Sequence, residues 1–225
     1  MIQINKLRKN YGKLEVLKSI DRVFNAGKVY GIVGENGAGK TTLFRCLAGL
    51  ESFRGQIDSP FEILKNHLGF LETNPYFLSR VTAKEHLQLF CNARNIKIAD
   101  FEEKNLFDLP LNQYAETYST GMKKKLALTA LLVQDNDILI LDEPFNGVDI
   151  HSNMMILELI KKWKTAGKTL LLSSHIFSTL EESCDEIHLM REGQFVQNVE
   201  KKDFHLLDLQ MRAFIIGDRL KKLHL

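Results

Sequence analysis

Residues 34–42, GENGAGKTT, combine residue types and a spacing that can bind phosphate. The stretch fits Gly-x-x-x-x-Gly-Lys-Ser/Thr, and it lies between an apolar run and a helical pattern. Gly37 and Gly39 allow the backbone to curl, so that successive N–H groups point inward at an anion. Lys40 supplies a mobile charge for the β- and γ-phosphates, and Thr41 offers a hydroxyl to Mg²⁺. The predicted nucleotide-binding residues here are Gly34, Glu35, Asn36, Gly37, Ala38, Gly39, Lys40, Thr41 and Thr42.

A second candidate group lies where the apolar run DILILD ends. Asp142 and Glu143 follow each other there, and adjacent residues of a strand point to opposite sides. We expect Asp142 to face the Mg²⁺ shell together with Thr41. Glu143 would then orient and polarise the water that attacks the γ-phosphate. The alternative is that two acids only make a strand end soluble, and the phosphate loop argues against it.

His175 ends the next apolar run, TLLLSSH. A lone histidine more often has a structural role. However, the carboxyl ends of parallel strands meet at one edge of a sheet, and ligands bind there. The imidazole could then reach the γ-phosphate or the attacking water. The predicted catalytic residues are therefore Glu143 and His175.

The stretch YSTGMKKKLAL, residues 118–128, is an unfavourable helix start. Ser119 or Thr120 can cap it, but Gly121 is about 1 kcal/mol worse there than a good helix former. Lys123–Lys125 then occupy the positive end of the helix dipole. A triphosphate facing this end would explain these features, because the Ser119 hydroxyl and the N–H groups around Gly121 can bind the γ-phosphate. Whether the lysines touch the nucleotide or line an interface stays open.

The elements that must position these residues alternate between strands and helices. This alternation predicts an α/β fold in which a parallel sheet is flanked by helices, with an antiparallel β part at the N-terminus. The character becomes helical and looping before YSTGM, which indicates an inserted helical subdomain. The predicted division is a core of residues 1–72 and 133–202, a helical subdomain of residues 73–132 and a short tail of residues 203–225.

Composition limits the class of protein. The 225 residues can bury a sizeable core, and a formal net charge of +2 gives no reason to expect a nucleic-acid partner. The three cysteines have no metal-ligand spacing, which is typical of free thiols in a reducing cytosol. The N-terminus has no apolar signal core, so any membrane role is expected to need a partner chain.

Four motifs, in this order along the chain, resemble those of the nucleotide-binding subunit of ABC transporters. They are the phosphate loop, YSTGM, the acidic strand end and the strand-end histidine. The resemblance covers essentially the whole chain. YSTGM matches the position of the family signature, usually Leu-Ser-Gly-Gly-Gln, and keeps Ser119 and Gly121. FNGVD is similar to the family's D-loop, with Asp149 at its acidic position. Tyr11 matches the aromatic residue that stacks on adenine, a contact that tolerates different bases.

The resemblance implies a P-loop ATP hydrolase with ATP and Mg²⁺ as cofactors. Two copies of the chain would hold two ATP molecules head to tail, each phosphate loop facing the other copy's signature. Hydrolysis would drive transport through a separate integral membrane permease subunit. The chain would be cytoplasmic and peripheral on the inner face of the cell membrane. YSTGM with FNGVD is more similar to exporters of drugs, lipids or antimicrobial peptides, but the motifs decide neither cargo nor direction.

The sequence departs from the family pattern after the strand LGFL. The family carries a glutamine there that touches Mg²⁺ and the membrane subunit, whereas this chain has Thr73. Glu72 could substitute if the register shifts by one. The resemblance also implies that the helical subdomain forms a groove for the membrane subunit. The candidates for that groove, for which a core role is an equal alternative, are Phe70, Tyr76, Phe77 and Leu78.

Two other functions remain as alternatives. A soluble ABC ATPase acting on ribosomes or DNA usually has two such domains or long coiled coils, and this chain has neither pattern. A P-loop kinase would leave YSTGM and His175 unexplained.

Overall fold

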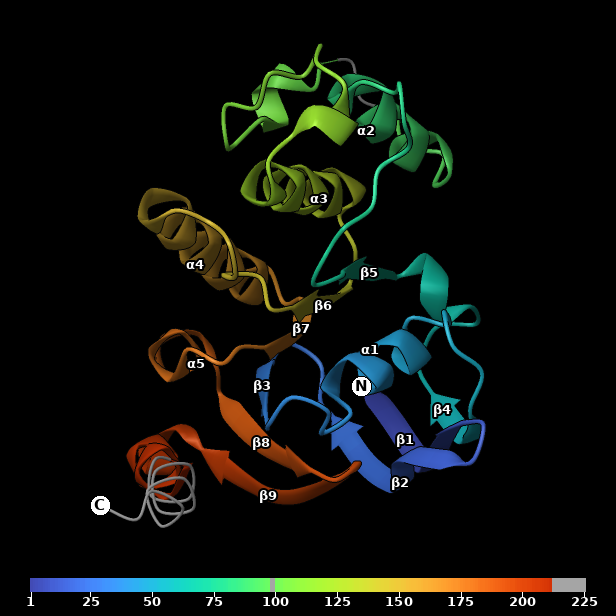
Figure 1. The fold of residues 1–225 in the computed structure, drawn as a ribbon, viewed down its shortest axis with the longest axis vertical. Coiled ribbons are helices and arrows are strands. Elements are labelled where there is room, and N and C mark those ends of the chain that lie inside the picture. Colours follow the sequence, from blue (N-terminus) through green and yellow to red (C-terminus); the bar gives the residue numbers. More distant parts are fainter. Residues whose placement is uncertain (98–99, 212–225) are drawn as a thin grey trace, which may run out of the picture.

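The computed structural model describes residues 1–97 and 100–211, which form two sheets and the helices around them (Figure 1). The larger sheet has the strand order β5-β6-β7-β3-β8-β9, and its first five strands run parallel while β9 pairs antiparallel with β8. Its strands are β3 (Val29–Val33), β5 (Leu68–Leu71), β6 (Ile138–Asp142), β7 (Thr169–Ser173), β8 (Glu186–Arg191) and β9 (Gln194–Glu200).

The smaller sheet is the predicted antiparallel part at the N-terminus. Its order is β2 (Leu14–Phe24), β1 (Ile2–Tyr11) and β4 (Arg54–Asp58), and all its pairs are antiparallel. The sequence did not predict β4. Its five residues, RGQID, offer one large apolar side chain, and none of them is buried, so pairing with β1 rather than an apolar pattern makes it a strand.

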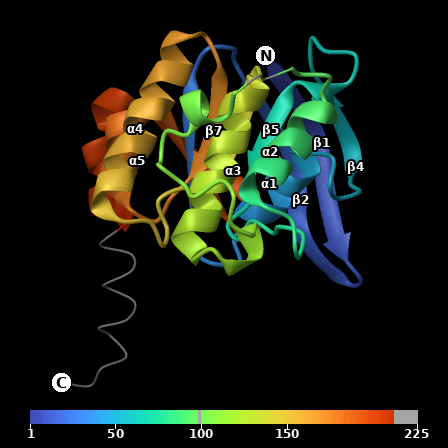
Figure 2. The same ribbon diagram turned by 90° about the horizontal axis from the view of Figure 1, so that it is seen from above.

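Helices cover both faces of the larger sheet, as Figure 2 shows for α4 and α5 on one side of β7 and α1 on the other. The helices are α1 (Lys40–Leu47), α2 (Ala83–Asn92), α3 (Thr120–Gln134), α4 (Ile150–Thr165) and α5 (Phe177–Ser183), and residues 204–211 are also helical. Short 3-10 turns lie at Leu64–Asn66 (η1), Glu102–Lys104 (η2), Ala115–Thr117 (η3) and Lys201–Asp203 (η4).

The central strands are apolar on both sides because each side meets its own core cluster. On β6, Leu139 and Leu141 belong to the cluster that contains α4, whereas Ile138 and Ile140 belong to the cluster that contains α1. The second cluster also contains apolar side chains of β1 and β2, so α1 is enclosed between the two sheets. A continuous apolar strand is what a parallel sheet covered on both faces requires. The predicted fold class is therefore confirmed.

The inserted segment carries α2 and α3, which pack on each other beside the end of the sheet that bears β5 (Figure 1). A capping box between Thr82 and Glu85 starts α2. Between α2 and α3 the described residues form turns, the 3-10 segments η2 and η3, and one isolated bridge from Tyr114 to Thr82. α3 also runs two residues beyond the predicted boundary at residue 132. Most of the predicted tail, residues 212–225, lies outside the described residues.

Candidate functional site

The phosphate loop connects β3 to α1, and its glycines are required by its geometry. Gly37 and Gly39 have φ angles of 85° and 107°, which a residue with a Cβ rarely adopts. A Cβ on Gly34 would lie 2.2 Å from the carbonyl oxygen of Met190 on β8. Lys40 Nζ donates to the carbonyl oxygen of Gly34 at 2.7 Å, and burial lowers the pKa of Lys40. The loop thus has the curled backbone that the sequence predicted.

Asp142, at the end of β6, is the centre of a cluster of hydroxyl groups. Its carboxylate is 1% exposed. Thr41 Oγ1 from α1 and Thr73 Oγ1 from the segment after β5 both donate to Asp142 Oδ2 at 2.7 Å. Ser173 Oγ, at the end of β7, donates to Asp142 Oδ1 at 2.6 Å. Three separate elements therefore converge on one carboxylate.

This cluster can hold Mg²⁺ beside a bound nucleotide. Mg²⁺ prefers oxygen ligands and is usually held by one or two protein groups, phosphate oxygens and water. Thr41 and Asp142 supply such oxygens next to the phosphate loop. Within residues 1–97 and 100–211 no group of three or more His, Cys, Asp or Glu side chains is arranged to hold a metal alone. The geometry therefore suits a metal that shares its ligands with a nucleotide.

Glu143 and His175 lie together at the same edge of the sheet. Glu143 Oε2 is 2.8 Å from His175 Nδ1, and Glu143 is the less exposed of the two side chains. The backbone of Glu143 is left-handed, with φ of 52°, a conformation that costs a non-glycine residue about 1–3 kcal/mol. Its N–H donates to Ser173 Oγ at 3.0 Å, which links it to the cluster around Asp142.

One cavity of about 1270 Å³ unites most of the predicted site residues. Side chains from the phosphate loop, from the ends of β6 and β7 and from the segment after β5 all line it. The predicted residues among its lining are Gly34, Glu35, Asn36, Gly37, Gly39, Lys40, Thr41, Thr42, Asp142, Glu143 and His175. Its size and its cationic and anionic groups suit a nucleoside triphosphate with a divalent cation.

Ser119 and Gly121 are not among the residues lining this cavity. Ser119 caps α3, and its Oγ accepts from the N–H of Met122 at 3.2 Å. Gly121 packs against the loop before α4, since a Cβ there would lie 2.6 Å from the carbonyl oxygen of Gly147. Asp149 caps α4 and pairs with Lys125 at 2.9 Å. The helix start that the sequence singled out therefore belongs to a separate surface of the same chain.

Tyr11 also lies outside the cavity lining, at the end of β1. Its ring is 45% exposed and lies 4.8 Å from Lys9 Nζ, and its hydroxyl interacts with Glu51 and Thr42. Stacking of Tyr11 on adenine stays a prediction. Leu14 and Val16 from β2 line the cavity beside the phosphate loop, and the sequence reasoning missed both. Their strand position was predictable, but their placement against the loop depends on the packing of two sheets.

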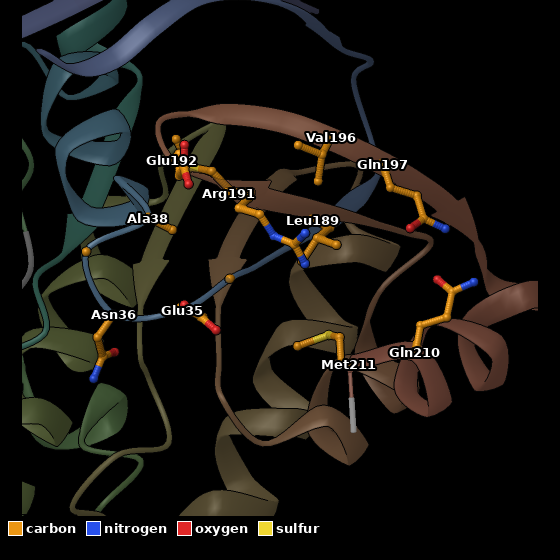
Figure 3. A pocket seen from close by; sticks show the side chains of 13 residues that line it. Glu35, Asn36, Ala38, Leu189, Arg191, Glu192, Val196, Gln197, Gln210 and Met211 are labelled. Atoms are coloured by element: carbon orange, nitrogen blue, oxygen red, sulfur yellow. The ribbon is translucent and has the colours of Figure 1, made fainter. Parts of the chain in front are cut away.

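A second cavity, of about 630 Å³, adjoins the outer side of the phosphate loop (Figure 3). The β8–β9 hairpin forms its opposite wall, with Arg191 and Gln197, and Met211 of the C-terminal helix closes one end. Ala38 of the predicted nucleotide-binding residues lines this cavity and not the larger one. The phosphate loop is thus bordered by a cavity on each of two sides.

A hollow of about 250 Å³ between β5, α2 and α3 contains three of the four groove candidates. Phe70, Tyr76 and Phe77 line it, whereas Leu78 does not. Tyr76 is 77% exposed, and Phe77 is 5% exposed and packs edge-on against His86. Phe77 therefore has the core role, and Tyr76 is a surface side chain. Glu72 also lines the hollow and pairs with Arg45 of α1 at 2.6 Å.

A sequence profile of the ABC transporter family matches residues 17–146 of this chain. The chain belongs to this family. It is 36% identical to the ABC transporter ATP-binding protein NatA of Bacillus subtilis, over 81% of each chain. It is 30% identical to the bacitracin transport ATP-binding protein BcrA of Enterococcus faecalis, over 97% of this chain and 75% of that one.

The fold agrees with solved members of the family. A structure described as the ATP-binding subunit of an ABC transporter superimposes with a TM-score of 0.83 at 25% identity, over 95% of both chains. The chain is thus an ABC transporter ATP-binding subunit and an ATP hydrolase. Among the residues that the structure describes, no helix is both long and apolar enough to cross a membrane.

Proposed function

We propose that this subunit binds MgATP in the 1270 Å³ cavity and works as a head-to-tail pair. Each phosphate loop would face the signature, Ser119 and Gly121, of the other copy. The observation that carries the proposal is the separation within one chain: the loop, Asp142 and Glu143 share a cavity that the signature does not line. A second copy supplies the missing half of the site.

In this arrangement each side chain has a defined task. Lys40 exchanges its bond to the carbonyl of Gly34 for bonds to the β- and γ-phosphates. Thr41 and Asp142 hold Mg²⁺. Glu143 accepts a hydrogen bond from the attacking water, and His175, 2.8 Å from Glu143, stabilises charge at the γ-phosphate.

The ATP cycle would act on an integral membrane permease, and the subunit would lie on the inner face of the cell membrane. The hollow with Tyr76 supports this, because an exposed aromatic beside apolar walls suits a helix of a partner. Residues 73–76 connect the hollow to the proposed Mg²⁺ site. Tyr76 lines the hollow, and the hydroxyl of Thr73 donates to Asp142. The relatives named for bacitracin transport and lantibiotic transport support a role in transport.

Glu143→Gln tests the proposed pair. The amide keeps the size of the side chain but removes the charge that polarises water, so the variant should bind ATP and turn it over at least about a hundredfold more slowly. With saturating MgATP its mass by light scattering should double. Glu181→Gln, at an exposed position of α5, is the matched control and should behave as the parent protein. A Glu143→Gln variant that binds ATP and stays monomeric, alone and with its membrane partner, would contradict the proposal.

A further inference from the structure

Lys124 is a buried lysine on α3, the helix that begins at the signature. It is 1% exposed, although the sequence places it in a run of three lysines. Its Nζ donates to the carbonyl oxygen of Glu143 at 2.7 Å and to that of Asn146 at 2.9 Å. The side chain therefore reaches from α3 to the turn that follows β6.

This turn carries the residue proposed to activate water. The N–H of Asn146 donates to the carbonyl of Glu143 at 3.2 Å, which closes the turn, and Lys124 binds the carbonyls at both of its ends. The backbone at Glu143 is left-handed, and such a conformation persists only where surrounding contacts hold it. The bond from Lys124 to the carbonyl of Glu143 is one of these contacts. The bond from the backbone N–H of Glu143 to Ser173 Oγ is another.

Burying an ammonium group costs several kcal/mol unless hydrogen bonds compensate. An unbranched apolar side chain would fill the same space without that cost. The contribution specific to the lysine is therefore its pair of bonds to the turn. Two neighbouring contacts bring the same elements together, the close approach of Gly121 to Gly147 and the ion pair of Lys125 with Asp149.

We propose, on the basis of the head-to-tail pair above, that Lys124 is a positioning residue that couples the two ATP sites. Glu143 acts on the ATP bound by its own chain, whereas the signature at the start of α3 contacts the ATP of the other copy. Lys124 joins these two parts through one side chain. A shift of α3 that follows the state of one ATP would thus move Glu143 at the other.

Lys124→Met tests the proposal, with Lys162→Met, at an exposed position of α4, as the control. We expect Lys124→Met to lower kcat by about tenfold or more, because misplacing a catalytic group by a fraction of an ångström has effects of this size. In a Glu143→Gln background it should also raise the ATP concentration for half-maximal dimerisation by about tenfold. The Kd for ATP of the monomer should stay within about twofold of the parent value, since Lys124 does not line the cavity. Lys162→Met should change none of the three.

If Lys124→Met does not fold, Lys124→Gln replaces it. The glutamine side chain is shorter than that of lysine, and its amide keeps the site polar. The proposal is overturned if the substituted chain hydrolyses ATP and dimerises as the parent does. It is also overturned if kcat, dimerisation and the monomer Kd all worsen together, because that pattern indicates general damage. Failure of the proposed function would give a different result, because the Glu143→Gln chain would then not dimerise even with Lys124 intact.

Discussion

His188 on β8 gives the chain a stability that depends on pH. Its ring is 1% exposed and packs against the rings of Phe24, Tyr30 and Phe195 at 5.5 to 5.7 Å between centroids. Within the described part of the chain, neither ring nitrogen has a hydrogen-bond partner. Burial, with a smaller effect of the Arg22 charge, lowers the pKa of His188 from 6.5 to about 3. The carboxylate of Glu186 lies 3.7 Å from Nε2, too far for a hydrogen bond that would offset the burial.

Because this pKa is lower in the folded chain, protonation favours unfolding. The stabilising contribution is fully present above pH 6.5 and is lost as the pH falls from there toward pH 3. With these two pKa values, the free energy of unfolding should fall by about 2 kcal/mol between about pH 7.5 and about pH 5 from His188 alone. Carboxylates contribute little in this interval, since their unfolded pKa values lie near 4.

The assay is urea unfolding at both pH values, followed by the fluorescence of Trp163, which is 6% exposed. His188→Phe should remove about 2 kcal/mol of the pH-dependent loss, because phenylalanine fits an aromatic site and cannot take a proton. His151→Gln, at an exposed position of α4, serves as the control and should leave the loss unchanged. If His188→Phe loses as much stability as the parent, within about 0.5 kcal/mol, the reasoning about the buried ring is wrong.

Further expectations concern the ATP site. Thr73→Val should lower ATP turnover by about tenfold, since it removes a hydrogen bond to the carboxylate of Asp142. Thr73→Ser keeps the hydroxyl and should preserve turnover. Equal phosphate release by the two variants would contradict this role. Gly34→Ala should weaken ATP binding more than Gly37→Ala by about tenfold or more in calorimetry, because a Cβ would meet the Met190 carbonyl only at position 34. Equal affinities of these two variants would show that the predicted clash is relieved.

The sequence was sufficient for the parts of the site that depend on neighbours in the chain. The phosphate loop, the acids after β6 and the cap at Ser119 each lie within a few residues of the strand or helix that positions them. Parallel strands then bring Asp142, Glu143 and His175 to one edge, which general rules for such sheets predict. This is why most of the predicted residues line one cavity.

The parts that the sequence did not predict depend on contacts between distant segments. Thr73 reaches Asp142 across 69 positions, and its hydroxyl bond is not visible in a local pattern. The local pattern does not distinguish Lys124 from its two lysine neighbours, because the turn at Glu143 that it binds is distant in the sequence. β4 has no apolar pattern because it is formed by pairing with β1. In each case tertiary packing decides what the local pattern leaves open.

Mixing two inactive variants tests the head-to-tail pair most directly. Lys40→Met removes the phosphate-binding charge. Ser119→Asp keeps a good helix cap but places a carboxylate against the γ-phosphate of the other copy, and Ser119→Asn is its neutral control. A mixed pair has one site with both defects and one intact site, so an equal mixture should recover up to about a quarter of the parent ATP turnover. A mixture no more active than the two variants measured separately would contradict the shared site.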